Sequence, residues 1–270
     1  MTPTLTISDP SDPRIAAYRD IRERDLVGRE NRFIAEGKVV IDVLLSARRF
    51  EAESVLLLPS RLSGMEAVLA KLPGHVPVYC AEPAVMDAIA GFHLHRGILA
   101  IGRKRPAEKV GDVLAGLPEE ALVVVAAGIA NHDNMGAIFR NAAAFGACAV
   151  LLDPISCDPL YRKAIRVSVG AVLKVPFATA PDAGMLVEAL DDAGFAQAAL
   201  SPGGKLALSA VPRGQRRALW LGAEGTGLPE DLLSRIPSVR IPQAPQWDSL
   251  NVAAASAVAL YHFSGAGEAV

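Results

Sequence analysis

The sequence predicts an α/β protein with a largely parallel sheet, organised as two domains. Short apolar runs rich in β-branched residues alternate with longer stretches of helical periodicity, which is typical of this fold class. A polar stretch that contains glycine and proline, Gly102 to Glu120, separates an early series of such elements from a later one. We therefore expect a domain boundary in this stretch.

The early series contains three expected strands and three expected helices. The strands are Ser54 to Leu58, Pro77 to Cys80 and Gly97 to Ile101. The helices lie around Val39 to Ala47, Met65 to Leu72 and Ala84 to Ala90. The later series has strands at Ala121 to Gly128, Cys148 to Leu152 and Ala218 to Gly222.

Composition limits the possible functions. At 270 residues with 51% hydrophobic content, the chain can bury a substantial core. A net charge of -2 argues against a protein that coats nucleic acid, although it leaves room for local basic patches. Two basic stretches qualify as such patches or as ordinary solvated segments. They are Arg19, Arg22, Arg24, Arg29 and Arg32, and then Arg103, Lys104, Arg105 and Lys109.

The three cysteines indicate a reducing compartment. Cys80, Cys148 and Cys157 are odd in number and lack C-x-x-C spacing, so we expect free thiols and no metal site. The first residues lack a basic segment followed by an apolar one, and no apolar run is long enough to span a bilayer. We expect a cytoplasmic protein.

The first chemically informative stretch is AGIANHDNMGAIFRNAAAFG, which directly follows a predicted strand. Asp133 or Asn134 can cap a helix here, and Ile138, Ala142 and Phe145 would then face the sheet. Arg140 would lie on roughly the opposite side and could reach a cleft at the carboxyl end of the strand. An ordinary exposed arginine is the alternative.

The second stretch, LWLGAEGTGLPEDL, predicts a strand, a glycine loop and a helix opened by Pro229. Gly222, Gly225 and Gly227 permit positive φ and close approach of a ligand to the backbone. The loop matches neither the dinucleotide fingerprint nor the phosphate loop. Glu224 within it is either a functional carboxylate or a solvated turn residue.

The third stretch is VRIPQAPQWDSLNVAAASAVALYHF. A short strand that ends at Ile241 leads into a loop, after which Ser249 or Asn251 caps a long, alanine-rich helix. Capping and close helix packing account for this stretch when it is taken alone.

Together, the three stretches resemble the signature of the SpoU-type (TrmH-like) RNA ribose 2′-O-methyltransferases of the SPOUT superfamily. The first motif matches at Asn131, Asn134, Gly136, Arg140, Ala142, Phe145 and Gly146. The second matches at Leu219, Leu221, Gly222, Glu224, Gly227 and Leu228, and the third at Ile241, Pro242, Ser249, Leu250, Asn251 and Val252. Upstream, RFIAEGKVVIDVLLSA is similar to the opening of the small RNA-substrate-binding domain of that family.

This resemblance implies a specific architecture. We expect an RNA-substrate-binding domain at residues 1–105, a linker at 106–120 and a methyltransferase domain with a trefoil knot at 121–270. It also implies a homodimer that forms through the carboxyl-terminal domain, with the helix from Asn251 to Phe263 as the candidate interface.

The resemblance also implies the site. S-adenosylmethionine would be bound by Leu221, Gly222, Ile241 and Leu250, and no metal is expected. The residues expected to act in catalysis are Arg140, Asn134, Glu224, Ser249 and Asn251. Since a guanidinium stays protonated in proteins, Arg140 is expected to hold the adjacent phosphate and stabilise the developing alkoxide.

Four positions depart from the motifs of the family. His132 replaces a usual proline, Asn141 a usual threonine, Gln243 a methionine and Pro245 a glycine. Pro245 matters most, because proline fixes φ in a loop that shapes the cofactor pocket. A catalytically silent RNA-binding or ribosome-assembly factor therefore stays open as an alternative. A nicotinamide-dependent oxidoreductase would need a glycine fingerprint after its first strand, and this sequence has none. Whether the RNA is tRNA or rRNA is left open.

Overall fold

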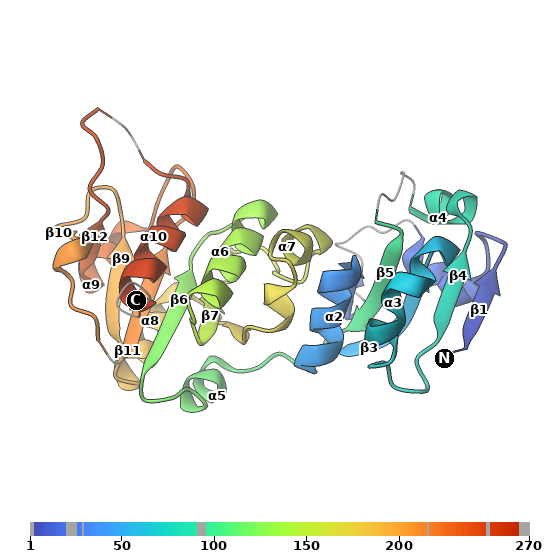
Figure 1. Ribbon diagram of the computed structural model, residues 1–270. Helices are drawn as coiled ribbons and strands as arrows, with labels where there is room; N and C mark the ends of the chain where they lie inside the picture. Colours follow the sequence, from blue (N-terminus) through green and yellow to red (C-terminus); the bar gives the residue numbers. More distant parts are fainter. Residues whose placement is uncertain are drawn as a thin grey trace. The chain divides into compact units, whose positions relative to one another are not determined.

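The computed structural model describes residues 3–19, 26–28, 30–90, 96–214, 216–246 and 249–264. The chain forms two compact units, one of Met1–Pro106 with Leu160–Lys174 and the other of Ala107–Pro159 with Val175–Val270. Helices and strands alternate in each unit (Figure 1), which confirms the predicted α/β class. In the described part of the chain, no helix is both long and apolar enough to cross a membrane.

The first unit contains a mixed five-stranded sheet of order β1-β4-β3-β5-β2. Its strands are β1 (Thr4–Ile7), β2 (Arg32–Glu36), β3 (Glu51–Leu57), β4 (Val78–Ala81) and β5 (Ile98–Arg103). β3 pairs in parallel with β4, whereas β5 runs antiparallel to both β3 and β2. β3, β4 and β5 confirm the three strands expected in this part of the sequence, and β1 and β2 are additional.

The helices of the first unit cover this sheet. They are η1 (Pro13–Tyr18), α2 (Lys38–Ala47), η2 (Pro59–Arg61), α3 (Leu62–Leu69), α4 (Pro83–Ala90), α7 (Arg162–Val167) and η3 (Ala171–Leu173). α7 and η3 come from residues that the predicted boundaries place in 121–270, but they pack on β2 and α2. An ion pair between Arg162 Nε and Glu36 Oε2, 3.2 Å long and largely buried, joins α7 to β2.

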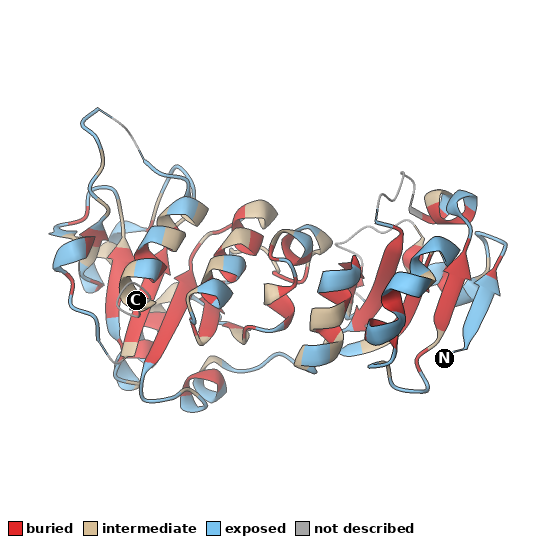
Figure 2. Cartoon of the chain, in the orientation of Figure 1, coloured by how far each residue is buried: buried red, intermediate tan, exposed pale blue. Residues whose placement is uncertain are grey.

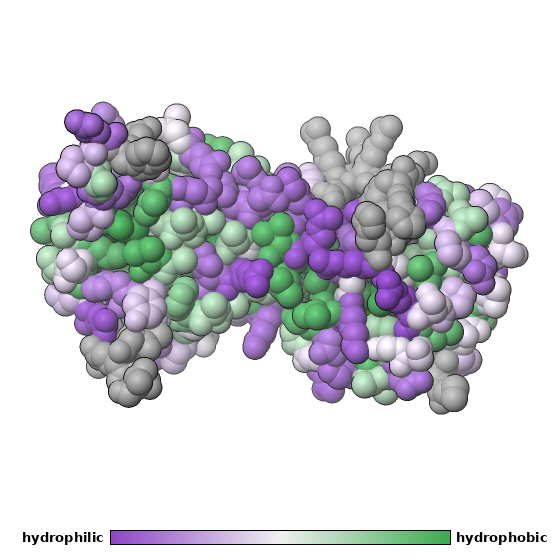
Figure 3. Space-filling view, turned by 45° about the horizontal axis from the view of Figure 1, so that its top comes forward, coloured by the Kyte–Doolittle hydropathy of each residue, from purple (hydrophilic) through white to green (hydrophobic). Residues whose placement is uncertain are grey.

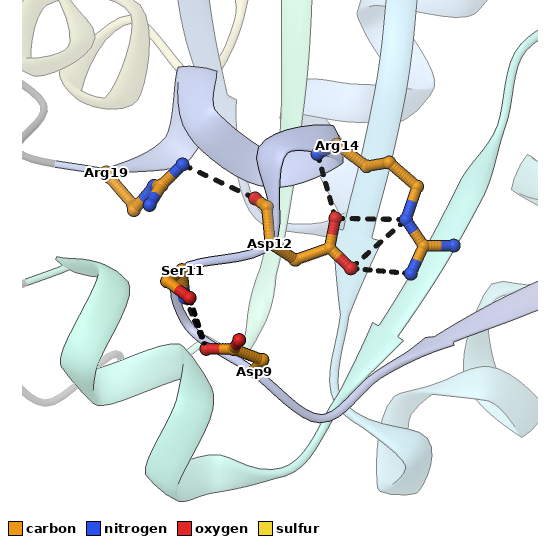
Figure 4. A network of polar contacts seen from close by, with 5 residues as sticks. All are labelled: Asp9, Ser11, Asp12, Arg14 and Arg19. Atoms are coloured by element: carbon orange, nitrogen blue, oxygen red, sulfur yellow. Dashed lines mark hydrogen bonds and ion pairs between the residues drawn. The ribbon is translucent and has the colours of Figure 1, made fainter.

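A polar network closes the turn between β1 and η1 (Figure 4). The carboxylate of Asp12 accepts hydrogen bonds from the backbone nitrogen of Arg14 at 2.9 Å and from its Nε at 3.0 Å. These bonds lower the pKa of Asp12 to about 2. Asp12 therefore stays ionised at neutral pH and caps η1.

Two arginines of the basic stretches are paired with a carboxylate. Arg22, Arg24 and Arg29 lie outside the described residues. Arg32 pairs with Glu53 at 2.6 Å, and Arg103 pairs with the same carboxylate at 3.2 Å. These arginines on β2 and β5 therefore form an ion-pair network with β3, which lowers the net positive charge of this surface.

The second unit contains a seven-stranded sheet of order β10-β12-β9-β11-β6-β7-β8. Its strands are β6 (Ala121–Ala126), β7 (Ala149–Leu152), β8 (Phe177–Thr179), β9 (Ala196–Leu200), β10 (Leu206–Ala207), β11 (Arg216–Leu221) and β12 (Ser238–Arg240). All of its strand pairings are parallel, as the sequence predicts. The central strands are buried along their length (Figure 2), which explains their continuous apolar sequence.

Helices lie on both faces of this sheet. They are α5 (Val110–Ala115), α6 (His132–Ala144), α8 (Ala183–Asp192), η4 (Leu208–Ala210), α9 (Glu230–Arg235) and α10 (Val252–Ser264). α5, α8 and α9 share one buried cluster with Trp220 of β11, while α6 and α10 lie side by side (Figure 1). α5 falls within the expected linker 106–120, and its Val113 and Leu114 are buried in that cluster.

The start and end of α6 correct two expectations. The N-cap is Asn131, whose side chain accepts a hydrogen bond from the backbone nitrogen of Asp133 at 2.8 Å, so neither Asp133 nor Asn134 caps the helix. Asn131 has extended backbone, whereas the other two already lie in the first turn. Phe145, which was expected to face the sheet, is the C-cap of the helix and packs its ring on Tyr261 of α10, with centroids 6.1 Å apart.

The side chain of Asn141 links α6 to α10 through two hydrogen bonds. Its Nδ2 donates to the carbonyl oxygen of Ala253 at 2.8 Å and to Oγ of Ser256 at 2.9 Å. Ser256 is fully buried. The departure from threonine at position 141 thus has a structural role, because the longer amide bridges two helices that both begin at the candidate site.

Candidate active site

Three loops follow parallel strands of the second sheet. They connect β6 to α6, β11 to α9 and β12 to α10. Because the strands are parallel, the loops begin at the same edge of the sheet, where open α/β sheets bind ligands. The three informative stretches of the sequence are therefore brought to one edge.

The loop after β11 requires glycine at its first position. A Cβ atom on Gly222 would lie 2.4 Å from the backbone nitrogen of Leu228 and 2.5 Å from the carbonyl carbon of Gly227. The loop closes through a hydrogen bond from the nitrogen of Gly227 to the oxygen of Ala223 at 3.0 Å. Gly225 and Gly227 have φ of +83° and +69°, a region that other residues enter at a cost.

Asn251 links the first turn of α6 to the loop after β11. Its Nδ2 donates to Glu224 Oε1 at 2.7 Å and to Asn134 Oδ1 at 3.1 Å. Its Oδ1 accepts from the backbone nitrogen of Ala253 at 2.9 Å, so Asn251 rather than Ser249 caps α10. Both ends of the amide are thus engaged, and its orientation is determined by its partners.

The carboxylate of Glu224 is the negative charge of this cluster. Asn134 is 7% exposed on α6, whereas Glu224 and Asn251 face solvent. Among the residues that the structure describes, no cation pairs with Glu224, and a neutral amide holds its Oε1. Its charge can therefore act on a cationic ligand.

A cavity of about 370 Å³ opens beside this cluster, within the size range of small-molecule sites. It is lined by all four residues expected to bind the cofactor, Leu221, Gly222, Ile241 and Leu250. Glu224, Ser249 and Asn251 line it as well. Leu250 is 38% exposed, so part of the apolar wall is open to a ligand.

Arg140 lies apart from the other expected residues. It is exposed on α6 and does not line the cavity. Asn134, six residues earlier on the same helix, is less than two turns away. Within the described residues no hydrogen bond or ion pair occupies Arg140, so its guanidinium can bind an anion. The structure thus brings the other eight residues together and leaves Arg140 on a neighbouring helix surface.

Asp153 is a structural support that the sequence did not reveal. This buried residue follows β7, and its carboxylate accepts the backbone nitrogens of Gly128 at 3.0 Å and Ser156 at 2.9 Å. Ser156 Oγ in turn accepts the backbone nitrogen of Ile129 at 3.0 Å. These bonds hold the loop that leads into α6. An aspartate after a strand is a visible turn signal, but its partners are not.

The turn after β9 supplies a cavity wall that sequence reasoning missed. Leu200, Ser201 and Pro202 line the cavity. Gly204 follows them, and a Cβ there would lie 2.3 Å from the carbonyl carbon of Val239, so this turn lies directly on β12. Ser-Pro-Gly-Gly is a turn signal, but the alanine-rich β9 before it lacks the β-branched content that marks a strand.

Comparison with known proteins gives consistent matches. A protein-family model described as the SpoU rRNA Methylase family matches residues 121–261. An uncharacterized tRNA/rRNA methyltransferase of Mycobacterium bovis is 39% identical over 277 residues, which cover 97% of this chain and 92% of that protein.

Two solved structures share the fold. A structure described as an RNA 2′-O ribose methyltransferase has a TM-score of 0.78 and 27% identity, over 96% of this chain and 98% of that chain. The AdoMet-bound rRNA methyltransferase from Sinorhizobium meliloti has a TM-score of 0.79 and 24% identity, over 98% of both chains. The similarity therefore extends over both units.

Proposed function

The chain belongs to the SpoU rRNA methylase family, and from this we propose that it transfers a methyl group from S-adenosylmethionine to a ribose 2′-hydroxyl of structured RNA. The observation that carries the proposal is the cavity beside the Asn134–Asn251–Glu224 cluster, which gathers the second and third motifs. The relative from Mycobacterium bovis is named as acting on tRNA or rRNA. Both are therefore candidate substrates, and either is consistent with the cytoplasmic location that the cysteines suggest.

The cavity suits S-adenosylmethionine. Ile241 and Leu250 offer apolar walls to the adenine ring, and the loop that begins at Gly222 brings backbone polar groups close to a ligand. Glu224 supplies a negative charge for a ligand that carries a sulfonium and an ammonium. When bound, S-adenosylmethionine provides the electrophilic methyl group.

We assign Arg140 to binding the RNA at the methylated ribose. A 2′-hydroxyl attacks the methyl group more readily as its proton departs and negative charge develops on oxygen. The Arg140 guanidinium, which has no hydrogen-bond or ion-pair partner among the described residues, holds the neighbouring phosphate and stabilises that charge. The proton passes to phosphate, water or Glu224, so Arg140 acts by positioning and charge rather than as a base.

Asn251 and Asn134 serve as positioning residues. Asn251 is fixed as the cap of α10, and it holds Glu224 at 2.7 Å and Asn134 at 3.1 Å. We assign Ser249, which lines the same cavity, to the cofactor or ribose side of the site. The trefoil knot in the second unit and RNA binding by the amino-terminal domain remain predictions from the family.

We also propose that the chain forms a homodimer through α10. Ala254, Val258 and Tyr261 follow one another at helical spacing and are all exposed, Val258 by 44% and Tyr261 by 51%. Figure 3 shows apolar surface gathered on the side of the second unit that carries this helix. A second copy that presents the same stripe would bury both faces by isologous pairing.

The homodimer can be checked by light scattering. We expect the mass of two chains for the wild type, and a shift toward one chain for Val258→Glu with Tyr261→Glu, because two carboxylates would be buried at the interface. Met185→Glu, at another exposed apolar position of the second unit, is the matched control. A wild-type monomer at micromolar concentration would contradict the dimer.

Labelled methyl transfer tests the function itself. Total RNA from a strain that lacks the gene is incubated with the protein and labelled S-adenosylmethionine, and the modified nucleotide is mapped. We expect a label on a ribose 2′-oxygen of tRNA or rRNA. A label on a base would refute the ribose assignment. Calorimetric binding of S-adenosylmethionine without any transfer would instead support the catalytically silent factor.

A further inference from the structure

The cavity contains one hydrogen-bonding group without a partner. Gln243 lines the cavity and is partly buried. Its Oε1 is covered from solvent, and no donor reaches it within the described part of the chain. A buried acceptor without a donor is unfavourable. A ligand in this cavity is therefore a natural source of the missing donor.

The backbone around Gln243 is restrained. Pro242 precedes it, and Pro245 follows two residues later. Each proline fixes its own φ and limits the residue before it, so the loop has few conformations to lose when a ligand binds. The terminal torsion of a glutamine side chain is soft, so a small rotation can turn its amide toward a ligand.

Both Gln243 and Pro245 depart from the motif that this chain otherwise matches. A methionine thioether is a weak acceptor, whereas an amide supplies a strong acceptor and two donors. The substitution therefore adds a hydrogen-bonding group to the pocket, and the nearby proline restricts the loop that carries it.

We propose that the side-chain amide of Gln243 accepts a hydrogen bond from the bound cofactor and is a specificity-determining residue of this chain. The inference rests on the proposed function, because it takes S-adenosylmethionine as the ligand. Three groups of that ligand can donate: the adenine amine, a ribose hydroxyl and the amino-acid ammonium. An amide pairs well with adenine, which offers a donor beside an acceptor, so the adenine amine is the first candidate.

S-adenosylhomocysteine is the coproduct that remains when S-adenosylmethionine has lost its methyl group. Calorimetry with this ligand tests the assignment without turnover. We expect Gln243→Met to weaken binding by up to about tenfold, the effect of losing one hydrogen bond. The ligand-free melting temperature should stay equal or rise, because the variant removes an unpaired acceptor. Gln246→Met, an exposed glutamine of the same loop, should bind as the wild type does.

Analogues identify the donor. S-inosylhomocysteine lacks the adenine amine, and deoxyribose and desamino analogues lack the other two donors. The analogue without the relevant donor should bind wild type and Gln243→Met equally, while the others retain the difference. Equal binding of S-adenosylhomocysteine by both proteins would overturn the role of Gln243. A wild-type protein that binds neither S-adenosylmethionine nor S-adenosylhomocysteine would overturn the proposed function.

Discussion

Arg140→Ala is expected to abolish methyl transfer while S-adenosylmethionine still binds. Loss of an electrostatic contact to developing negative charge lowers kcat by about 100- to 1000-fold in comparable sites. Arg140 does not line the cavity, so the pocket for the cofactor should be unchanged. Single-turnover transfer to RNA measures the first effect, and calorimetry measures the second.

Two further variants make this expectation specific. Arg140→Lys keeps the charge but loses the planar fork that binds phosphate, so we expect only partial recovery. Arg235→Ala removes an exposed arginine of α9, which lies 3.5 Å from the carboxylate of Glu188, and should leave transfer unchanged. Substantial residual turnover in Arg140→Ala would mean that another group stabilises the alkoxide.

The fold could be predicted where hydrophobic pattern decides it. β6 is apolar along its length and β11 is apolar from Ala218 onward, and both overlap the strands that the sequence predicts. β9 was not predictable in this way, because its sequence AQAAL has no β-branched residue. Its extended conformation is stabilised by pairing with β11 and β12. Tertiary contacts likewise place α7 in the first unit, where Arg162 pairs with Glu36.

The site was predictable as a set of residues but not as a network. Motif order identified the expected residues of the cavity wall, since they lie at or beyond the carboxyl ends of parallel strands. The bonds from Asn251 to Glu224 and Asn134 join positions 27 and 117 residues apart in the chain, and no local pattern encodes such pairs. The supporting role of Asp153 was hidden for the same reason. Gln243 was visible only as a departure from a motif.

Gly222→Ala is expected to eliminate measurable cofactor binding. Its Cβ would meet backbone atoms at 2.4 Å and 2.5 Å, and backbone cannot move aside as a flexible side chain can. The loop would have to open, which displaces Glu224 two residues later and separates it from Asn251. Calorimetry with S-adenosylhomocysteine should show at least about a 100-fold loss of affinity, equivalent to about 2.7 kcal/mol.

Gly225→Ala separates steric crowding from backbone strain. Gly225 has φ of +83°, but a Cβ added there would meet no heavy atom within 4 Å, so alanine costs strain of about 1–2 kcal/mol without a steric clash. We expect it to lower the free energy of unfolding while S-adenosylhomocysteine still binds. If Gly222→Ala bound the ligand as well as Gly225→Ala does, the close packing of this loop would not be what shapes the pocket, and the cavity would have to be formed mainly by the segment from Ile241 to Asn251.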